Sequence, residues 1–173
     1  MPIPEPLFSV SPKERWAVCH CRPRCEKKLA ALLHSEKMVH FLPQIENVRR
    51  YGRHERRSLL PLFPGYLFAR IDPDLRSRMF RQDLLARIIP VADETLLLRQ
   101  LVDVKKVVDA GVEVLRYDQV ARGARVKVIS GPLFGVEGRV EDVTSPRGII
   151  VSVDVLQRGL LITLPVVQLE VIL

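Results

Sequence analysis

A short, mostly apolar run near the start of the chain is followed by apolar positions at helical spacing. Residues 15–21 (RWAVCHC) form this run, which predicts a β-strand with Trp16 and Val18 on the same face. After Pro23 the apolar positions recur at about helical intervals, with charged residues between them: Leu29, Leu32, Leu33 and Val39. The first forty residues therefore predict a strand, a short turn and a helix.

The next seventy residues continue this mixture of strands and helices. Strands are predicted over residues 40–51 and 55–61, joined by a turn at Gly52, and then over 66–71 and 86–91. Asp72 before Pro73 is typical of a helix start and predicts a helix over residues 74–82. A further helix is predicted over 99–110, closed by Gly111 as its C-cap.

The pattern changes again beyond Gly111. Helical spacing is absent, and short β-rich runs follow one another at 125–129, 138–143, 148–156, 160–163 and 167–171. Short strands at this density predict a small barrel. The expected fold class is α+β: an N-terminal α/β sandwich, with an antiparallel sheet and flanking helices, joined by a linker to a small C-terminal all-β barrel. The expected boundaries are a flexible leader at 1–12, a first domain at 13–111, a linker at 112–121 and a barrel at 122–173.

Composition indicates a globular chain with an anionic partner. Of the 173 residues, 47% are hydrophobic and 27% charged, and the net charge is +7. The net charge of residues 122–173 is only +1, so the net charge of residues 1–121 is +6. An excess of positive charge favours nucleic acid as a partner, although it is also typical of an ordinary solvated surface. A nucleic-acid contact is therefore expected in the first domain.

Several classes of protein are disfavoured. No apolar run reaches the ~20 residues of a membrane helix, and the proline-rich start is unlike a signal peptide. Three cysteines without a disulfide spacing favour a reducing, cytoplasmic location. Cys19, Cys21 and Cys25 with His20 raise the possibility of a metal site. However, Cys19 and Cys21 lie on the strand face opposite His20, and no second ligand cluster follows. A Cys/His nucleophile is disfavoured because no orienting acid stands beside it, and no phosphate loop or carboxylate pair is visible, so neither an enzyme nor a cofactor is expected.

Two motifs in a fixed order carry a family resemblance. Residues 126–140 (VKVISGPLFGVEGRV) resemble the KOW motif, in which a strand ends in Gly-Pro and a later glycine opens the next strand. Residues 61–68 (PLFPGYLF) come about fifty residues after Trp16 of the first predicted strand. Together they resemble the NusG family of transcription elongation factors. The resemblance implies a first domain that sits on the clamp helices of RNA polymerase.

The resemblance also implies which residues contact polymerase. Family members use aromatic residues of this motif and of the first strand. Carried over by position, the polymerase-binding residues are His20, Phe63, Pro64, Tyr66 and Phe68. His20 stands where some relatives have tyrosine. The alternative for Phe63 and Phe68 is an ordinary place in the core.

A run of arginines surrounds the predicted turn at Gly52. Its members are Arg49, Arg50, Arg53, Arg56 and Arg57. Five arginines near a hairpin tip are expected to contact upstream or non-template DNA through its phosphates. The alternative is a solvated charged loop.

The C-terminal domain is expected to recruit a further partner. In the family this partner is the termination factor Rho or a ribosomal protein, bound through aromatic residues, whereas the matching positions here are Leu133, Val136 and Leu156. This departure favours a specialised paralogue of the RfaH type, an operon-specific antiterminator. The many β-branched residues after 148 favour a stable barrel over a fold switch. The alternatives are a ribosome-associated KOW RNA-binding protein, an enzyme with a β-barrel appendage and a pure scaffold.

Overall fold

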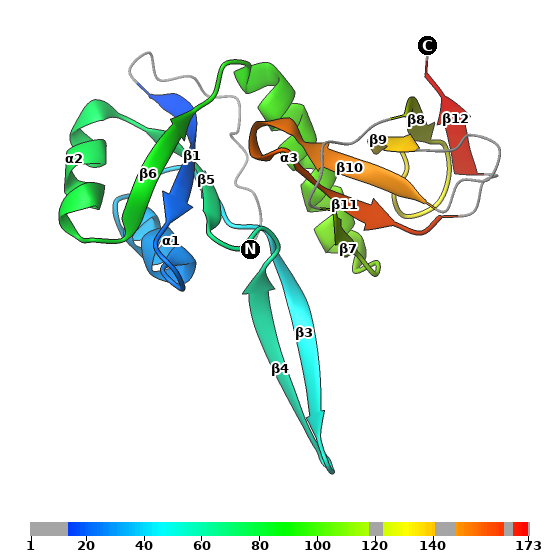
Figure 1. The fold of residues 1–173 in the computed structure, drawn as a ribbon, viewed down its shortest axis with the longest axis horizontal. Coiled ribbons are helices and arrows are strands. Elements are labelled where there is room, and N and C mark those ends of the chain that lie inside the picture. The colour runs from blue at the N-terminus through cyan, green and yellow to red at the C-terminus, as the bar shows by residue number, and fades with distance from the viewer. Residues whose placement is uncertain (1–13, 118–122, 141–147, 165–167, 173) are drawn as a thin grey trace. The chain divides into compact units, whose positions relative to one another are not determined.

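The computed structural model describes residues 14–117, 123–140, 148–164 and 168–172. The chain divides into two compact units, Met1–Ala92 and Asp93–Leu173, and Figure 1 follows the order of the elements in each. The expected leader at 1–12 lies outside the described residues. Each unit is built around its own antiparallel sheet.

The sheet of the first unit has four strands in its described part. They are β1 (Arg15–Cys21), β2 (His40–Phe41), β5 (Tyr66–Ile71) and β6 (Leu85–Pro90), in the order β2-β5-β1-β6. Each neighbouring pair is antiparallel. The strands predicted at 15–21 and 66–71 are confirmed to the residue.

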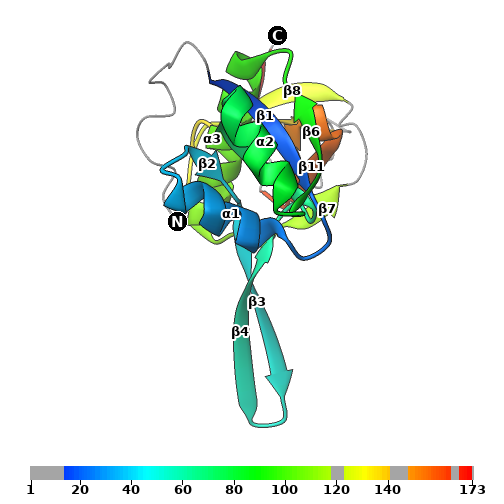
Figure 2. The same ribbon diagram turned by 90° about the vertical axis from the view of Figure 1, so that its left-hand side faces the viewer.

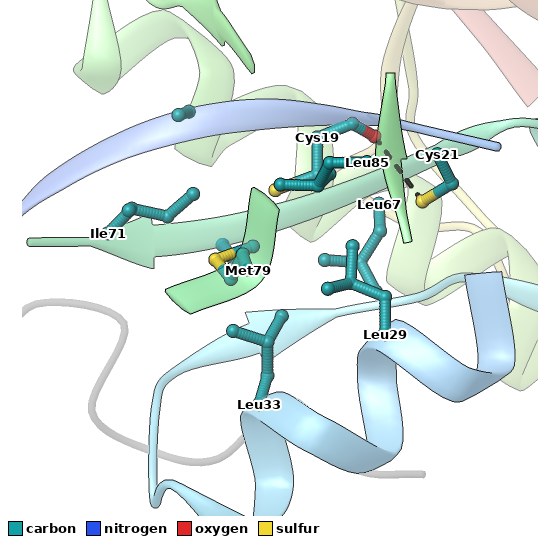
Figure 3. Packing of buried hydrophobic residues seen from close by; sticks show 10 residues of the cluster. Cys19, Cys21, Leu29, Leu33, Leu67, Ile71, Met79 and Leu85 are labelled. Carbon is teal, nitrogen blue, oxygen red and sulfur yellow. Dashed lines mark hydrogen bonds between the residues drawn. The ribbon is translucent and has the colours of Figure 1, made fainter. Parts of the chain in front are cut away.

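Two helices of this unit share a core with one face of the sheet. Helix α1 (Glu26–Ser35) contributes Leu29 and Leu33, and α2 (Pro73–Arg81) contributes Met79, all completely buried. Figure 3 shows these side chains converging on the sheet, and Figure 2 shows both helices on the side nearest the viewer. The sheet contributes alternate residues to this core: Ala17, Cys19, Cys21, Leu67, Ala69, Ile71 and Leu85. Alternation along each strand leaves the next residues, including Trp16, Val18 and His20, for the other face.

A long hairpin separates the sheet strands β2 and β5 in the sequence. Strands β3 (Gln44–Tyr51) and β4 (His54–Pro61) pair along their whole length, from Gln44 opposite Pro61 to Tyr51 opposite His54. The predicted turn at Gly52 is confirmed, and its φ of +59° lies in the region that favours glycine. In Figure 1 the hairpin extends well away from the sheet of its own unit. Most of its side chains are exposed, so its faces are available for contacts.

The second unit combines one long helix with a sheet. Helix α3 covers Glu94–Ala110, and Gly111, with φ of +62°, is the left-handed C-cap that was predicted. Six described strands form the sheet, in the order β12-β8-β9-β10-β11-β7. Their bounds are β7 Leu115–Tyr117, β8 Ala124–Val128, β9 Glu137–Val140, β10 Ile149–Val153, β11 Arg158–Ile162 and β12 Leu169–Val171, with a 3₁₀ turn at Asp154–Leu156. Parts of the strands predicted at 138–143 and 167–171 fall on undescribed residues.

The mixture of helices with antiparallel sheets agrees with the expected fold class, but two details differ. Helix α3 begins at Glu94, five residues before its predicted start, and groups with the strands that follow it, whereas the expected boundary lies after residue 111. The helix is tied to this unit by a hydrogen bond from the Asp154 backbone N–H to the Gln100 side chain, at 3.0 Å. The expected linker at 112–121 also contains β7, which pairs with β11.

Candidate functional site

The clearest surface feature of the first sheet is a pair of stacked rings at one end of it. His20 of β1 lies directly opposite Tyr66 of β5 in the ladder. Their ring centroids are 5.0 Å apart and the ring planes are inclined by only 18°. Both side chains are partly exposed, and Pro64 just before them is exposed. Three of the five predicted polymerase-binding residues therefore lie together at one accessible end of the two inner strands. We call them the ring edge: His20, Pro64 and Tyr66.

Backbone contacts fix the turn that carries Pro64. Gly65 donates its N–H to Glu26 Oε1 at 2.7 Å and accepts from the Cys21 N–H at 2.8 Å. The φ of Gly65 is +84°, a conformation that a residue with a Cβ adopts only with strain. Glu26 is only 7% exposed and lies in the first turn of α1. The turn is therefore held by a carboxylate from a different element, a role that sequence reasoning missed because the two residues are 39 positions apart.

Phe63 and Phe68 differ from the ring edge in being buried. Phe63 is 3% exposed and Phe68 is completely buried, and their rings meet edge to face with centroids 6.3 Å apart. Phe68 lies in the middle of the sheet, opposite Val18 on one side and Phe41 on the other. For these two residues the structure agrees with the alternative reading, an ordinary place in the core.

The cysteines lie in the core of the first unit. Cys19 and Cys21 are both buried on the face that packs against α1, and His20 between them belongs to the other face. Burial raises the pKa of the Cys19 thiol, and burial with the nearby Glu26 raises that of Cys21 to about 12, so both are neutral thiols near pH 7. Among the described residues no group of three or more His, Cys, Asp or Glu side chains is placed to hold a metal ion.

All five arginines predicted for nucleic acid lie near the free end of the β3–β4 hairpin, and all are exposed. Arg49 and Arg50 are on β3, Arg56 and Arg57 on β4, and Arg53 is in the turn. They are not equivalent, because Arg50 and Arg57 form ion pairs with carboxylates of the same hairpin. The structure thus brings the predicted residues together and divides them into two groups.

The predicted partner-binding residues of the second unit are mostly inaccessible. Leu133 and Val136, in the loop between β8 and β9, are completely buried, and Leu156 is partly buried. Phe134, between the first two, is 66% exposed, which makes it the most exposed of the large hydrophobic residues among the described positions. Sequence reasoning missed Phe134 because the motif places two apolar residues side by side, and only the conformation of the turn decides which one points inward.

Comparison with protein families identifies the chain. Residues 14–122 match the family model described as transcription termination factor NusG. The matched segment covers the first unit from residue 14 onward, with the ring edge and the hairpin, and also α3. This chain belongs to the NusG family.

Family membership establishes the general role of the protein. NusG-family proteins are non-enzymatic transcription factors that act in elongation and termination, and they typically bind RNA polymerase. The match ends at residue 122, so the β-rich region that follows lies beyond it. No curated protein matches the chain. No helix among the described residues is long and apolar enough to cross a membrane.

Proposed function

We propose that this NusG-family protein is an elongation factor that binds the clamp helices of RNA polymerase through the ring edge. The observation that carries the proposal is the stacked His20–Tyr66 pair, partly exposed beside the exposed Pro64. Rings at the centre of an interface tend to supply most of the binding energy, because they bury large rigid surfaces. The stack and the Glu26-anchored turn hold these residues in place before binding, which lowers the entropic cost of association.

Residues 13–111 are the proposed polymerase-binding domain, which is supported by the family match over residues 14–122, although α3 groups with the strands of the second unit. The buried aromatic residues support it indirectly. Phe63 and Phe68 set the position of the turn and the strand, and Tyr66 and Pro64 make the contact. The hairpin arginines are proposed to reach upstream or non-template DNA once the factor is bound. That contact is supported by five exposed guanidinium groups near one hairpin end.

The C-terminal β-rich region is proposed to be a KOW-type barrel that recruits a further partner. Leu156 and the exposed Phe134 are the side chains of this region best placed for such a contact, with a ribosomal protein or Rho as candidate partners. Leu156, a partly exposed aliphatic residue where the family resemblance implies an aromatic one, supports a specialised, operon-specific antiterminator of the RfaH type. A ribosome-associated RNA-binding role is the alternative, and it is disfavoured because residues 122–173 carry a net charge of only +1.

The test measures polymerase binding by matched variants of the full chain. Tyr66→Ala is expected to weaken binding by at least about tenfold with unchanged circular dichroism, because it removes a partly exposed ring at the proposed centre. Phe134→Ala, which removes an exposed ring from the other unit, is the control and is expected to bind like the wild type. Phe68→Ala is expected to lose stability, by about 3–5 kcal/mol, because its ring is completely buried. If Tyr66→Ala binds polymerase as tightly as the wild type, the ring edge is not the polymerase-binding surface.

A further inference from the structure

The two faces of the β3–β4 hairpin have different chemistry. Residues directly opposite each other in an antiparallel ladder project on the same face, and the face alternates along each strand. The register pairs Arg49 with Arg56 and Tyr51 with His54, so these four residues share one face. We call it the arginine–tyrosine face. Arg50 pairs with Glu55. Arg57, two positions from Glu55, and Glu46, four positions from Arg50, lie on the same side. We call this second side the ion-paired face.

The ion-paired face neutralises its own charge. Arg57 Nε lies 2.8 Å from Glu55 Oε1, and Arg57 Nη1 lies 3.6 Å from Glu46 Oε1. Arg50 Nε lies 3.7 Å from the other oxygen of Glu55. The hydrogen bond and charge of Glu55 raise the pKa of Arg57, as expected for a partnered guanidinium. Two arginines and two glutamates therefore leave this face with no net charge.

The arginine–tyrosine face carries charge without compensation. Arg49 and Arg56 are directly opposite each other, an arrangement of like charges that destabilises a ladder unless an anion lies between them. No acidic residue lies on this face between 44 and 61, and neither arginine has an ion pair within the described residues. Toward the tip, Tyr51 is 59% exposed beside His54. The face thus presents two guanidinium groups next to an accessible ring.

We propose that the arginine–tyrosine face binds single-stranded nucleic acid, with a phosphate between Arg49 and Arg56 and a base stacked on Tyr51. The inference rests on the proposed contact of the hairpin with nucleic acid and narrows it to one face and one form. Guanidinium groups bind phosphate oxygens in a bidentate manner. An exposed aromatic ring accepts the face of any unpaired base, whereas the bases of a duplex present only their edges. On the ion-paired face both guanidinium groups already lie within 4 Å of a carboxylate.

The test compares two double variants that remove the same charge from the same two strands. Binding of the full chain to a labelled single strand of about 12 nucleotides, as DNA and as RNA, is measured by fluorescence anisotropy over a range of salt. Arg49→Gln/Arg56→Gln is expected to weaken binding at least about tenfold and to reduce the salt slope by about 0.7, the value for one phosphate contact on a single strand. Arg50→Gln/Arg57→Gln, the matched control, is expected to change affinity less than about threefold. Equal losses would show that only net charge matters and would overturn the proposal.

The ring is tested separately from the charge. Tyr51→Ala is expected to weaken single-strand binding about fivefold or more, and Tyr51→Phe, which keeps the ring, to bind like the wild type. A duplex of the same sequence is expected to bind more weakly, and tighter or equal duplex binding contradicts the proposal. Binding of either the DNA or the RNA strand supports it. If the wild type binds neither, both this inference and the proposed nucleic-acid contact fail, while polymerase binding through the ring edge is judged by its own variants.

Discussion

At the scale of single residues, position along β5 decides which side chains of the PLFPGYLF motif reach the surface. Tyr66 and Phe68 are two residues apart on one strand and therefore share a face. Tyr66 begins the strand and is partly exposed, whereas Phe68 lies between Val18 and Phe41 and is completely buried. A strand pattern predicts the face of a residue but not which side chains cover it, such as the Phe63 ring that meets Phe68. The two aromatic residues could therefore not be separated beforehand.

Glu26 provides a prediction at this scale. Glu26→Ala removes the acceptor of the Gly65 N–H and leaves that donor without its partner in a partly buried turn. The free energy of unfolding is expected to fall by about 1–3 kcal/mol, and polymerase binding is expected to weaken because the turn carries Pro64. Urea denaturation measures the first effect. Glu26→Gln is the control, since its amide oxygen can still accept the hydrogen bond. If the alanine variant is as stable as the wild type, the carboxylate does not hold the turn.

At the scale of secondary-structure elements, strands were easier to predict than the limits of α3. Both runs are bounded by residues that end strands, Pro23 after the first and Gly65 and Pro73 beside the second, so both strands were predicted with their observed bounds. The start of α3 was missed because three leucines in succession, residues 96–98, obscure the helical period. Its true start is set by a local contact, since the Asp93 side chain accepts from the Leu96 N–H at 2.8 Å as an N-cap.

Asp103 of α3 provides a pH-dependent prediction. Burial raises its pKa to about 6, opposed by a hydrogen bond from the Glu137 N–H of β9 and by Lys106. Because the folded pKa exceeds the unfolded value near 4, the folded state binds the proton more tightly. The contribution of Asp103 to the free energy of unfolding therefore falls as the pH rises from about 4 to about 6, and it is constant above that.

The variant that tests this is Asp103→Asn, which cannot ionise but keeps an acceptor oxygen. It is expected to unfold at a higher temperature than the wild type at pH 7–8, and to lose most of this advantage at pH 4. Thermal unfolding followed by circular dichroism at both pH values measures the difference. Asp109→Asn, a change of equal charge at an exposed position of the same helix, is the control. A constant difference between Asp103→Asn and the wild type at both pH values would contradict the assignment.

At the scale of the whole molecule, the order of motifs carried more information than any single one. Three features together indicated the family: the strand with Trp16, the PLFPGYLF segment and the KOW-like motif at residues 126–140. The match over residues 14–122 establishes the family. The grouping of α3 with the strands after it could not be predicted, because it depends on contacts such as that of Gln100 with the Asp154 backbone, which are 54 positions apart. The division of the hairpin arginines between the two faces could not be predicted either. It depends on the register of β3 against β4, which a run of arginines does not specify.

The central claim is that this NusG-family protein acts on transcribing polymerase rather than on the ribosome. The most direct measurement is equilibrium binding of the fluorescently labelled full chain to purified core RNA polymerase and, in parallel, to purified ribosomes at the same salt. Saturable binding to polymerase that is lost in Tyr66→Ala, with weaker binding to ribosomes, is the predicted result. Saturable binding to ribosomes without binding to polymerase would contradict the account and favour the RNA-binding alternative.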